Sequence, residues 1–419
     1  MHILFLSDNF PPEVNAPASR THEHCREWVA AGHKVTVITC FPNFPKGEVF
    51  PGYRNRWRQR EIVDGIEVVR VWTYITPNSG FGRRVLDYLS FMLTGFLNAI
   101  FIRKVDVVVG TSPQFFTVCA AWAVSFIRRI PFVFELRDLW PESIKAVGAM
   151  KESLAIRALE KVELFLYRRA SRIVSVTHSF RRNLESRGID PKHVDVVTNG
   201  VDMTRFNPRE KDPALTAQLG LQGKFVAGYI GTHGLAHGLE TLLAAAAHLK
   251  SQPDGDAYRI LFLGDGALKA SLMADALAKG LTNVVFVDSV PKDEVARYWA
   301  LLDVSIIHLR KTELFSTVIP SKLFESMGMG IPVLHGVAGE SAEIVQREDV
   351  GIPFESENAL DLAQKLVMLA RDSQARERLK LNCCTAAKLF DRVTQAKYML
   401  QSLEGAVATR EREAFEGEL

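Results

Sequence analysis

The 419 residues are 47% hydrophobic and 24% charged, a composition typical of a globular protein, and the length exceeds what one ordinary core accommodates. We therefore expect two domains. Five cysteines without metal-ligand spacing exclude a disulfide framework and indicate a reducing compartment. The first residues run directly into a strand pattern, so no signal peptide is expected.

The net charge of +3 is unevenly distributed. Residues 1–205 carry a net charge of +8, and the remainder carries −5. A basic half indicates an anionic partner such as a membrane face or a phosphorylated lipid. Nucleic acid is not expected as a partner, because the basic residues occur as dispersed pairs and no nucleic-acid-binding module is recognisable.

The N-terminal half alternates strand and helix patterns. The apolar run Ile3–Ser7 predicts a strand, a loop over residues 8–19 and a helix over Arg20–Ala31 follow, and Lys34–Thr39 completes a β-α-β unit. Further strands are expected at Ile66–Val71, Val105–Gly110, Pro131–Leu136, Arg172–Val176 and Val194–Val197. This alternation predicts a doubly wound α/β layer around a parallel sheet.

Two stretches of this half have the composition of bilayer-contacting segments. Residues Val85–Ile102 contain one charged side chain and lie between basic pairs. A helix here is amphipathic, packed on the sheet or lying in a membrane interface rather than spanning it, because its polar side chains form one narrow stripe: Asp87, Ser90, Thr94 and Asn98. The stretch Gly52–Arg60 interleaves arginines with two aromatic residues, which fits a solvated loop or a lipid-headgroup surface.

The strand–helix pattern starts again after a turn-rich stretch at residues 199–208. The second set of strands is expected at Phe225–Ile230, Tyr258–Leu263, Val284–Val287, Val304–Ile307 and Ile331–Leu334. Two Rossmann-like units in tandem result, with a cleft between them. We predict an N-terminal domain over 1–205, a C-terminal domain over 206–390, and a helical tail over 391–419 that packs back toward the N-terminal domain.

The stretch from Ile319 to Val345 carries the strongest local signal. Ser321 is expected to cap a helix on which Lys322 and Glu325 share one face. A short strand and the glycine turn Gly336–Gly339 follow and lead into another helix start. Such a turn binds phosphate through its amides, and a fixed carboxylate beside it accepts ribose hydroxyls. Glycine turns also form ordinary corners in α/β proteins, so the nucleotide interpretation depends on the rest of the chain.

Motifs along the whole chain resemble one family. Beside the tandem Rossmann-like pattern and a Pro-Pro loop after the first strand, they are Gly32–Thr39, Asn199–Asp202, Leu263–Gly266 and Pro320–Met327. In this order they resemble the GT-B glycosyltransferases of family 4, the retaining group 1 enzymes. The stretches Arg137–Ser143 and Thr232–Glu240 are similar to the WbuB-type N-acetyl-L-fucosamine transferases of bacterial O-antigen and capsule synthesis.

The resemblance implies a UDP-sugar donor bound by the C-terminal half, with no cofactor and no required metal. It implies that Glu325 binds the ribose hydroxyls and that Lys322 supplies a cation to the diphosphate. Thr317 stands at the position of the family's first motif glutamate, and His233 and His237 stand near the usual Arg and Lys. The full set of matching donor-binding positions is His233, His237, Gly264, Asp265, Gly266, Thr317, Ser321, Ala338, Gly339, Glu340 and Ser341.

The resemblance also implies that the N-terminal half receives a lipid-linked saccharide, a polyprenyl diphosphate, at the cytoplasmic face of the plasma membrane. Asn15 and Ala16 replace the usual Gly-Gly of the first loop, and Arg137 stands where many relatives have His. Asp138 matches an acidic position in the cleft and is expected to be catalytic together with Lys322 and Glu325. No protein nucleophile is obvious, which favours front-side displacement in which the departing phosphate takes the acceptor proton.

Three other functions compete with sugar transfer. A nucleotide-sugar epimerase uses the same fold, but the basic, aromatic N-terminal half favours a lipid-linked acceptor. A non-catalytic subunit that binds nucleotide-sugar is compatible with Thr317 in place of the glutamate. A dinucleotide oxidoreductase is disfavoured, because no G-x-G-x-x-G motif follows the first strand.

Overall fold

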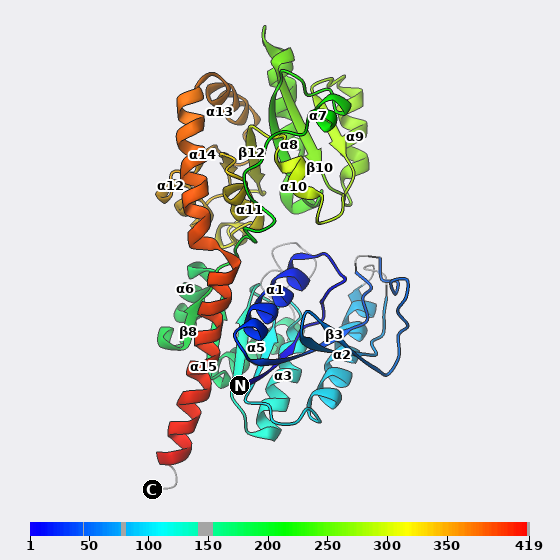
Figure 1. The fold of residues 1–419 in the computed structure, drawn as a ribbon, viewed down its shortest axis with the longest axis vertical. Coiled ribbons are helices and arrows are strands. Elements are labelled where there is room, and N and C mark those ends of the chain that lie inside the picture. Colours follow the sequence, from blue (N-terminus) through cyan, green and yellow to red (C-terminus); the bar gives the residue numbers. More distant parts are fainter. Residues whose placement is uncertain (45, 77–80, 141–153, 417–419) are drawn as a thin grey trace. The chain divides into compact units, whose positions relative to one another are not determined.

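The computed structural model describes residues 1–419 except 45, 77–80, 141–153 and 417–419, and it divides into two compact units (Figure 1). Unit 1 comprises Met1–Thr198 together with Arg392–Leu419, and unit 2 comprises Asn199–Asp391. Each unit contains a parallel or largely parallel sheet with helices on both faces. The predicted α/β class with two Rossmann-like units is therefore confirmed.

In unit 1 the described residues form an eight-stranded sheet in the order β3-β4-β2-β1-β5-β6-β7-β8, in which only the β3–β4 pairing is antiparallel. The strands are β1 His2–Leu6, β2 Lys34–Cys40, β3 Arg58–Val63, β4 Ile66–Val71, β5 Val107–Thr111, β6 Phe132–Leu136, β7 Arg172–Ser175 and β8 Val194–Val196. The central strands are fully buried apolar runs, as expected for a parallel sheet covered on both faces.

Two helical layers cover this sheet. One layer packs around Trp28 and Met399 and consists of α1 Ala16–Ala30 and α15 Arg392–Glu416. The other packs around Phe91 and Phe134 and consists of α2 Phe81–Ala99, α3 Phe115–Arg128, α5 Leu154–Arg169 and α6 His178–Ser186, with the short 3₁₀ turn Pro191–His193 beyond it. Helix α15 contacts α1, and the Trp28 indole donates a hydrogen bond to the Ala396 carbonyl at 2.8 Å.

Two local predictions in unit 1 need correction. Helix α1 begins at Ala16 rather than Arg20, because the Asn15 side chain accepts a hydrogen bond from Ala18 N at 2.8 Å and caps the helix early. The end of the arginine-rich stretch is strand β3 rather than loop, because the Asp64-Gly65 turn pairs it with β4. Helix α2 is amphipathic as predicted, but its polar stripe faces the domain. None of the helices in the described ranges is long and apolar enough to span a membrane.

Unit 2 contains a six-stranded parallel sheet in the order β11-β10-β9-β12-β13-β14. The strands are β9 Phe225–Ile230, β10 Tyr258–Leu263, β11 Val284–Val287, β12 Val304–His308, β13 Val333–Gly336 and β14 Gly351–Pro353. The sequence analysis missed β14, a short edge strand without an apolar run, and placed β13 two residues early because Ile331 and Pro332 extend the apolar pattern into the preceding loop.

Helices cover both faces of this sheet as well. Helices α8 Glu240–Lys250, α9 Lys269–Ala278 and α13 Ala359–Arg371 pack on one face. The other face is covered by α7 Pro213–Gln218, α10 Val295–Trp299, α11 Ser321–Met329, α12 Glu340–Arg347 and α14 Ser373–Ala387. Four 3₁₀ turns complete the unit: η2 Leu235–His237, η3 Gly255–Ala257, η4 Leu314–Thr317 and η5 Lys388–Phe390.

Each sheet has a point where the strand order reverses. In unit 1 the chain builds outward from β1 through β2 and then returns to place β5 on the other side of β1; in unit 2 it does the same with β9 and β12. At such a switch point the loops after the two strands diverge, and a crevice forms at their carboxyl ends. The two switch points therefore indicate where ligands bind in each unit.

Candidate functional site

The switch point of unit 2 brings together most of the residues matched to donor binding. His233 and His237 lie in the loop after β9, and Gly264–Gly266 follow β10. Gly339 and Glu340 follow β13. Helix α11, which carries Lys322, lies earlier in the chain, after β12 and η4. All of these strands end at the same edge of the parallel sheet, so these residues share one face of unit 2.

Lys322 and Tyr229 form the electrostatic centre of this edge. The Lys322 ammonium lies 3.7 Å from the centroid of the Tyr229 ring, and its Nζ atom is buried without a hydrogen-bond acceptor in the described part of the chain. The Tyr229 hydroxyl donates to the Thr232 carbonyl at 2.8 Å, which fixes the ring. Burial lowers the pKa of Lys322 to about 7, and Glu325 acts in the opposite direction. The site therefore holds a buried ammonium group to which no acceptor in the described part of the chain is hydrogen-bonded.

The two histidines of the β9 loop pack around the same tyrosine. Their ring centroids lie 6.0 Å (His233) and 5.8 Å (His237) from that of Tyr229. Burial, reinforced by neighbouring cations, lowers the pKa of His233 to about 4 and that of His237 to about 3. Both rings are therefore neutral near pH 7. His233 is fully buried, and His237 is partly buried.

The β9 loop is fastened to its neighbour across the switch point. The His308 Nδ1 donates to the His237 carbonyl at 2.7 Å, while its Nε2 accepts a hydrogen bond from Glu357 N at 2.9 Å. These two contacts require a neutral His308 with its proton on Nδ1. The loop that carries His233 and His237 is thus held in one position by the end of β12.

The loop after β10 approaches the β9 loop through glycines. A Cβ on Gly264 would lie 2.0 Å from the Gly231 carbonyl oxygen, so only glycine fits there. A Cβ on Gly266 would lie 2.6 Å from the His233 carbonyl oxygen, and Asp265 is exposed beside it. Lys269 fixes this loop, because its ammonium donates a hydrogen bond to the Gly264 carbonyl at 2.9 Å. Sequence analysis missed the role of Lys269.

The turn into α12 has the geometry expected of an anion-binding helix start. Gly339 adopts φ +78°, and a Cβ there would lie 2.0 Å from the Ser316 carbonyl oxygen. No side chain caps α12 in place of a ligand. Ser341 is buried and hydrogen-bonds His335 at 2.7 Å, Glu340 is also buried, and Ala338 is exposed at the tip of the turn. The first amides of α12 point away from their own helix, as in other phosphate-binding turns.

Helix α11 differs in one detail from its prediction. Its N-cap is Pro320 and no side chain caps it, so Ser321 is the first helical residue rather than the cap. Glu325 lies one turn after Lys322 and interacts with it electrostatically. Thr317 donates from Oγ1 to the Leu314 carbonyl at 2.7 Å within turn η4, which gives its hydroxyl a local structural partner.

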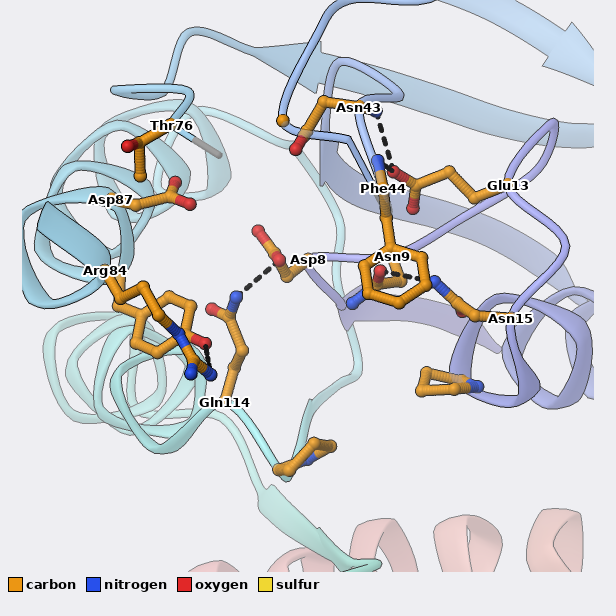
Figure 2. A pocket seen from close by; sticks show the side chains of 14 residues that line it. Asp8, Asn9, Glu13, Asn15, Asn43, Phe44, Thr76, Arg84, Asp87 and Gln114 are labelled. Atoms are coloured by element: carbon orange, nitrogen blue, oxygen red, sulfur yellow. Dashed lines mark hydrogen bonds between the residues drawn. The ribbon is translucent and has the colours of Figure 1, made fainter. Parts of the chain in front are cut away.

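The switch point of unit 1 contains a separate pocket of about 220 Å³, shown in Figure 2. The Asp8 carboxylate, just after β1, accepts a hydrogen bond from the Gln114 amide, just before α3, and so bridges the point of reversal. Asn15 lies at the pocket wall and donates to Asn9 Oδ1 at 2.7 Å. The full lining is Asp8, Asn9, Glu13, Asn15, Pro17, Asn43, Phe44, Gly47, Thr76, Arg84, Asp87, Tyr88, Pro113 and Gln114.

Three carboxyl groups share this pocket. Burial, with the nearby Asp87 and Glu13 charges, raises the pKa of Asp8 well above its usual range. Burial raises the pKa of Asp87 to about 6, and burial also raises the pKa of Glu13 although two backbone amides donate to it. Sequence analysis predicted Asn15 here but none of the carboxylates. The sequence feature that could have indicated them is the place of Asp8 in the loop immediately after the first strand.

Ala16, Arg137 and Asp138 lie outside the pocket lining. Ala16 is exposed at the first turn of α1. The backbone amides of Arg137 and Asp138 donate to Ser112 Oγ at 2.8 and 3.2 Å, which places both residues at the carboxyl end of β6. Burial lowers the pKa of Arg137 to about 10 despite the nearby Glu135 carboxylate. The rest of the matched stretch, residues 141–143, lies outside the described residues.

Each unit thus carries a site at its switch point, built on a buried cation and glycine turns in unit 2 and on carboxylates and amides in unit 1. Residues 15–200 match the family model of the glycosyl transferase 4-like domain, and residues 224–372 match that of the glycosyl transferases group 1. The chain is a group 1 glycosyltransferase of the GT-B fold.

Individual proteins agree with this assignment. The chain is 26% identical over 341 residues to WcaI of Escherichia coli, named as a colanic acid biosynthesis glycosyl transferase, covering 79% of this chain and 82% of WcaI. It is 24% identical to a GDP-mannose-dependent alpha-mannosyltransferase of Mycobacterium tuberculosis, covering 84% and 83%. Its fold matches Anabaena HepE, solved with UDP-glucose, with a TM-score of 0.69 and 18% identity over 96% of this chain and 99% of HepE.

Proposed function

We propose that this enzyme transfers a sugar, with retention of anomeric configuration, from a UDP-sugar to a polyprenyl-diphosphate-linked saccharide in bacterial surface-polysaccharide synthesis, at the cytoplasmic face of the plasma membrane. The sugar proposed is an N-acetylated deoxyhexosamine such as N-acetyl-L-fucosamine. The UDP of HepE and the named role of WcaI support the donor class and the polysaccharide context, and GDP is the competing nucleotide.

The buried Lys322 ammonium carries this proposal. A positive charge without an acceptor is costly in a protein interior, and it is retained where a ligand supplies the anion. A donor diphosphate satisfies it, and the α12 amides after Gly339 supply further donors. Glu325, one turn from Lys322, then accepts the ribose hydroxyls. The loop Gly264–Gly266 is assigned to the base, because it packs directly on the β9 loop at the same edge of the sheet and carries the exposed Asp265.

The transfer balances without a protein nucleophile. The bond between the sugar C1 and the diphosphate oxygen breaks, and the acceptor hydroxyl forms its bond to C1 on the same face. The hydroxyl proton passes to the departing phosphate oxygen. Negative charge grows on the phosphate during this step, where Lys322 and the helix-start amides stabilise it, and such preorganised charge is usually the largest catalytic contribution. In this scheme the positive charge comes from protein groups, and no metal ion is needed.

The pocket of unit 1 is proposed to hold the sugar end of the acceptor. Carboxylates and side-chain amides accept and donate hydrogen bonds to sugar hydroxyls, and the lining offers both kinds around Asp8, Asn9 and Asp87. Its carboxyl groups disfavour the acceptor diphosphate, which leaves the anionic end of the acceptor outside. Asp138, at the end of β6, is the candidate for orienting the acceptor hydroxyl.

The testing experiment measures binding and turnover separately. Thermal shifts are recorded with UDP, GDP, ADP and UDP-sugars for the wild type, Lys322→Met and the exposed control Lys279→Met. Binding stabilises the native state by about 2.7 kcal/mol at a hundredfold excess over Kd. We expect selective stabilisation by UDP that is lost in Lys322→Met and kept in the control.

Turnover is then followed as UDP release with membrane-extracted lipid-linked saccharides, and NMR of the product gives the anomeric configuration. UDP binding without turnover favours a non-catalytic nucleotide-sugar-binding subunit. Interconversion of the UDP-sugar itself favours an epimerase. Selective stabilisation by GDP instead of UDP overturns the proposed donor, and an inverted anomer overturns the mechanism.

A further inference from the structure

Helix α2 buries a polar stripe together with its apolar contacts to the domain. Its polar stripe faces the domain: Thr94 Oγ1 donates to the Trp72 carbonyl at 2.8 Å, and Asn98, 4% exposed, donates to the Thr94 carbonyl at 2.9 Å. Ser90 accepts a hydrogen bond from Tyr74 N at 2.7 Å. With these polar groups and Phe91 turned inward, three leucines of the helix face outward.

The outward face of α2 is a row of leucines. Leu86, Leu93 and Leu97 are 55%, 57% and 43% exposed, and Phe101, just beyond the helix, is 75% exposed. The spacing of the three leucines places them along one side of the helix over about 16 Å at 1.5 Å per residue. Single exposed apolar residues are ordinary, but several on one side of a helix indicate an interaction surface.

The apolar surface continues onto the two neighbouring helices. Arg128 of α3 donates to the Ile102 carbonyl, which joins the ends of α2 and α3. Phe126 and Ile127 are 70% and 54% exposed at that end of α3. Trp122 of α3 stacks on Phe126 at 5.7 Å and meets Phe165 of α5 edge-on at 5.0 Å, so the rings of the two helices form one patch.

Basic side chains surround the patch. Exposed arginines and lysines follow the C-terminal ends of the three helices: Arg103, Lys104, Arg129, Arg168 and Arg169. Residues 115–130 contain no acidic side chain, and Glu163 of α5 is buried in an ion pair with Arg187. An apolar patch with a cationic rim complements an anionic lipid surface, whereas a second copy of the same patch would bring like charges together.

We propose that the α2 leucine row and the exposed ends of α3 and α5 form the surface by which the protein docks on an anionic bilayer, with α2 lying along the interface. The link to lipid-linked substrates rests on the proposed function, while the docking itself does not. The two ideas meet on α2, because Leu86 faces outward while Asp87 and Tyr88 line the unit 1 pocket. A saccharide anchored in the bilayer would reach that pocket along the helix.

The test is co-sedimentation of the full chain with phosphatidylcholine vesicles, with and without phosphatidylglycerol. The variant is Leu93→Glu/Leu97→Glu, and the matched control is Leu277→Glu, a leucine 83% exposed on α9 of unit 2. We expect the wild type and the control to bind the anionic vesicles, and the double variant to bind at least about 30-fold more weakly. Arg103→Ser/Arg168→Ser should weaken binding mainly at low salt.

The UDP thermal shift of each variant is measured in parallel. Retained UDP binding with lost vesicle binding supports docking independently of the transferase proposal. If the double variant loses UDP binding, the milder variant Leu93→Ser/Leu97→Ser is tested in its place. Equal vesicle binding by the wild type and the double variant overturns the proposal, as does a wild type that does not bind anionic vesicles. A wild type that is dimeric in solution while the double variant is monomeric overturns it in favour of contact between two copies.

Discussion

Lys322 allows a sharp prediction, because its charge is costly in the free protein and useful when donor is bound. Replacing it with Met keeps the length of the side chain and removes the charge. The pKa of Lys322 in the folded protein is about 7 because of burial, against about 10.4 in an unfolded chain. Below pH 7 the native state therefore bears the full cost of a buried ammonium. Between pH 7 and 10.4 the unfolded state binds more protons, and the cost falls as pH rises.

Lys322→Met should consequently stabilise the free protein at pH 6 by about 1–3 kcal/mol, after subtracting a cation–π contact with Tyr229 worth about 1 kcal/mol. The gain should shrink as the pH rises toward 10. The same substitution should weaken UDP binding about 10- to 150-fold, because charged hydrogen bonds contribute about 1.5–3 kcal/mol. A variant that is more stable yet binds less is the signature of a charge kept for a ligand.

Two measurements check this. Thermal unfolding between pH 6 and 9 gives the stability difference, and titration calorimetry gives Kd for UDP and the protons taken up on binding. Wild-type binding should take up close to one proton above pH 7 and weaken about tenfold per pH unit there, and Lys322→Met should show neither effect. A variant that is less stable at pH 6, or a wild-type Kd that is flat from pH 7 to 9, would refute the reasoning.

Three further substitutions have distinct outcomes. Gly339→Ala should weaken UDP binding at least tenfold, because the added Cβ would lie 2.0 Å from the Ser316 carbonyl oxygen. The control Gly405→Ala has open space around it in α15 and should leave the Kd for UDP, measured by calorimetry, unchanged. Glu135→Ala should lower unfolding stability by about 3–5 kcal/mol in denaturant titrations, because the buried Arg20 guanidinium loses its carboxylate and keeps neutral acceptors such as the Val197 and Thr198 carbonyls, and a loss under 1 kcal/mol contradicts this. Asp87→Asn should raise Tm at pH 8 but not at pH 4, because burial raises the pKa of Asp87 to about 6 and its ionisation above that pH destabilises the native state; equal shifts at both pH values contradict this.

The sequence predicted the α/β class and most strands because buried parallel strands are long apolar runs bounded by turns. It missed β3 and β14 because neither edge strand is a buried apolar run: β3 alternates half-buried with exposed residues over most of its length, and β14 has only three residues. Periodicity gave the polar stripe of α2 but not its direction, since the stripe alone does not say which side the domain covers.

The candidate site was only partly predictable. Lys322, Glu325 and the Gly339 turn lie within one stretch, so spacing along the chain was enough to group them. The partner of Lys322 is Tyr229, which is far away in the sequence and reads simply as the last aromatic residue of a buried strand. Burial of His233 likewise depends on how two loops pack, and no local pattern encodes it.

The long helix α15 has a consequence for how the polypeptide matures. Residues 199–391 form unit 2 without interruption, so all of its elements are available as soon as Asp391 has been synthesised. Unit 1 began earlier on the ribosome, but the side of α1 that packs on α15 stays uncovered until Met399, Leu403 and Ala406 emerge. The half of the protein that is made first is thus completed last. Until then it exposes the apolar face that α15 later buries, which is the interval in which a chaperone has a surface to hold.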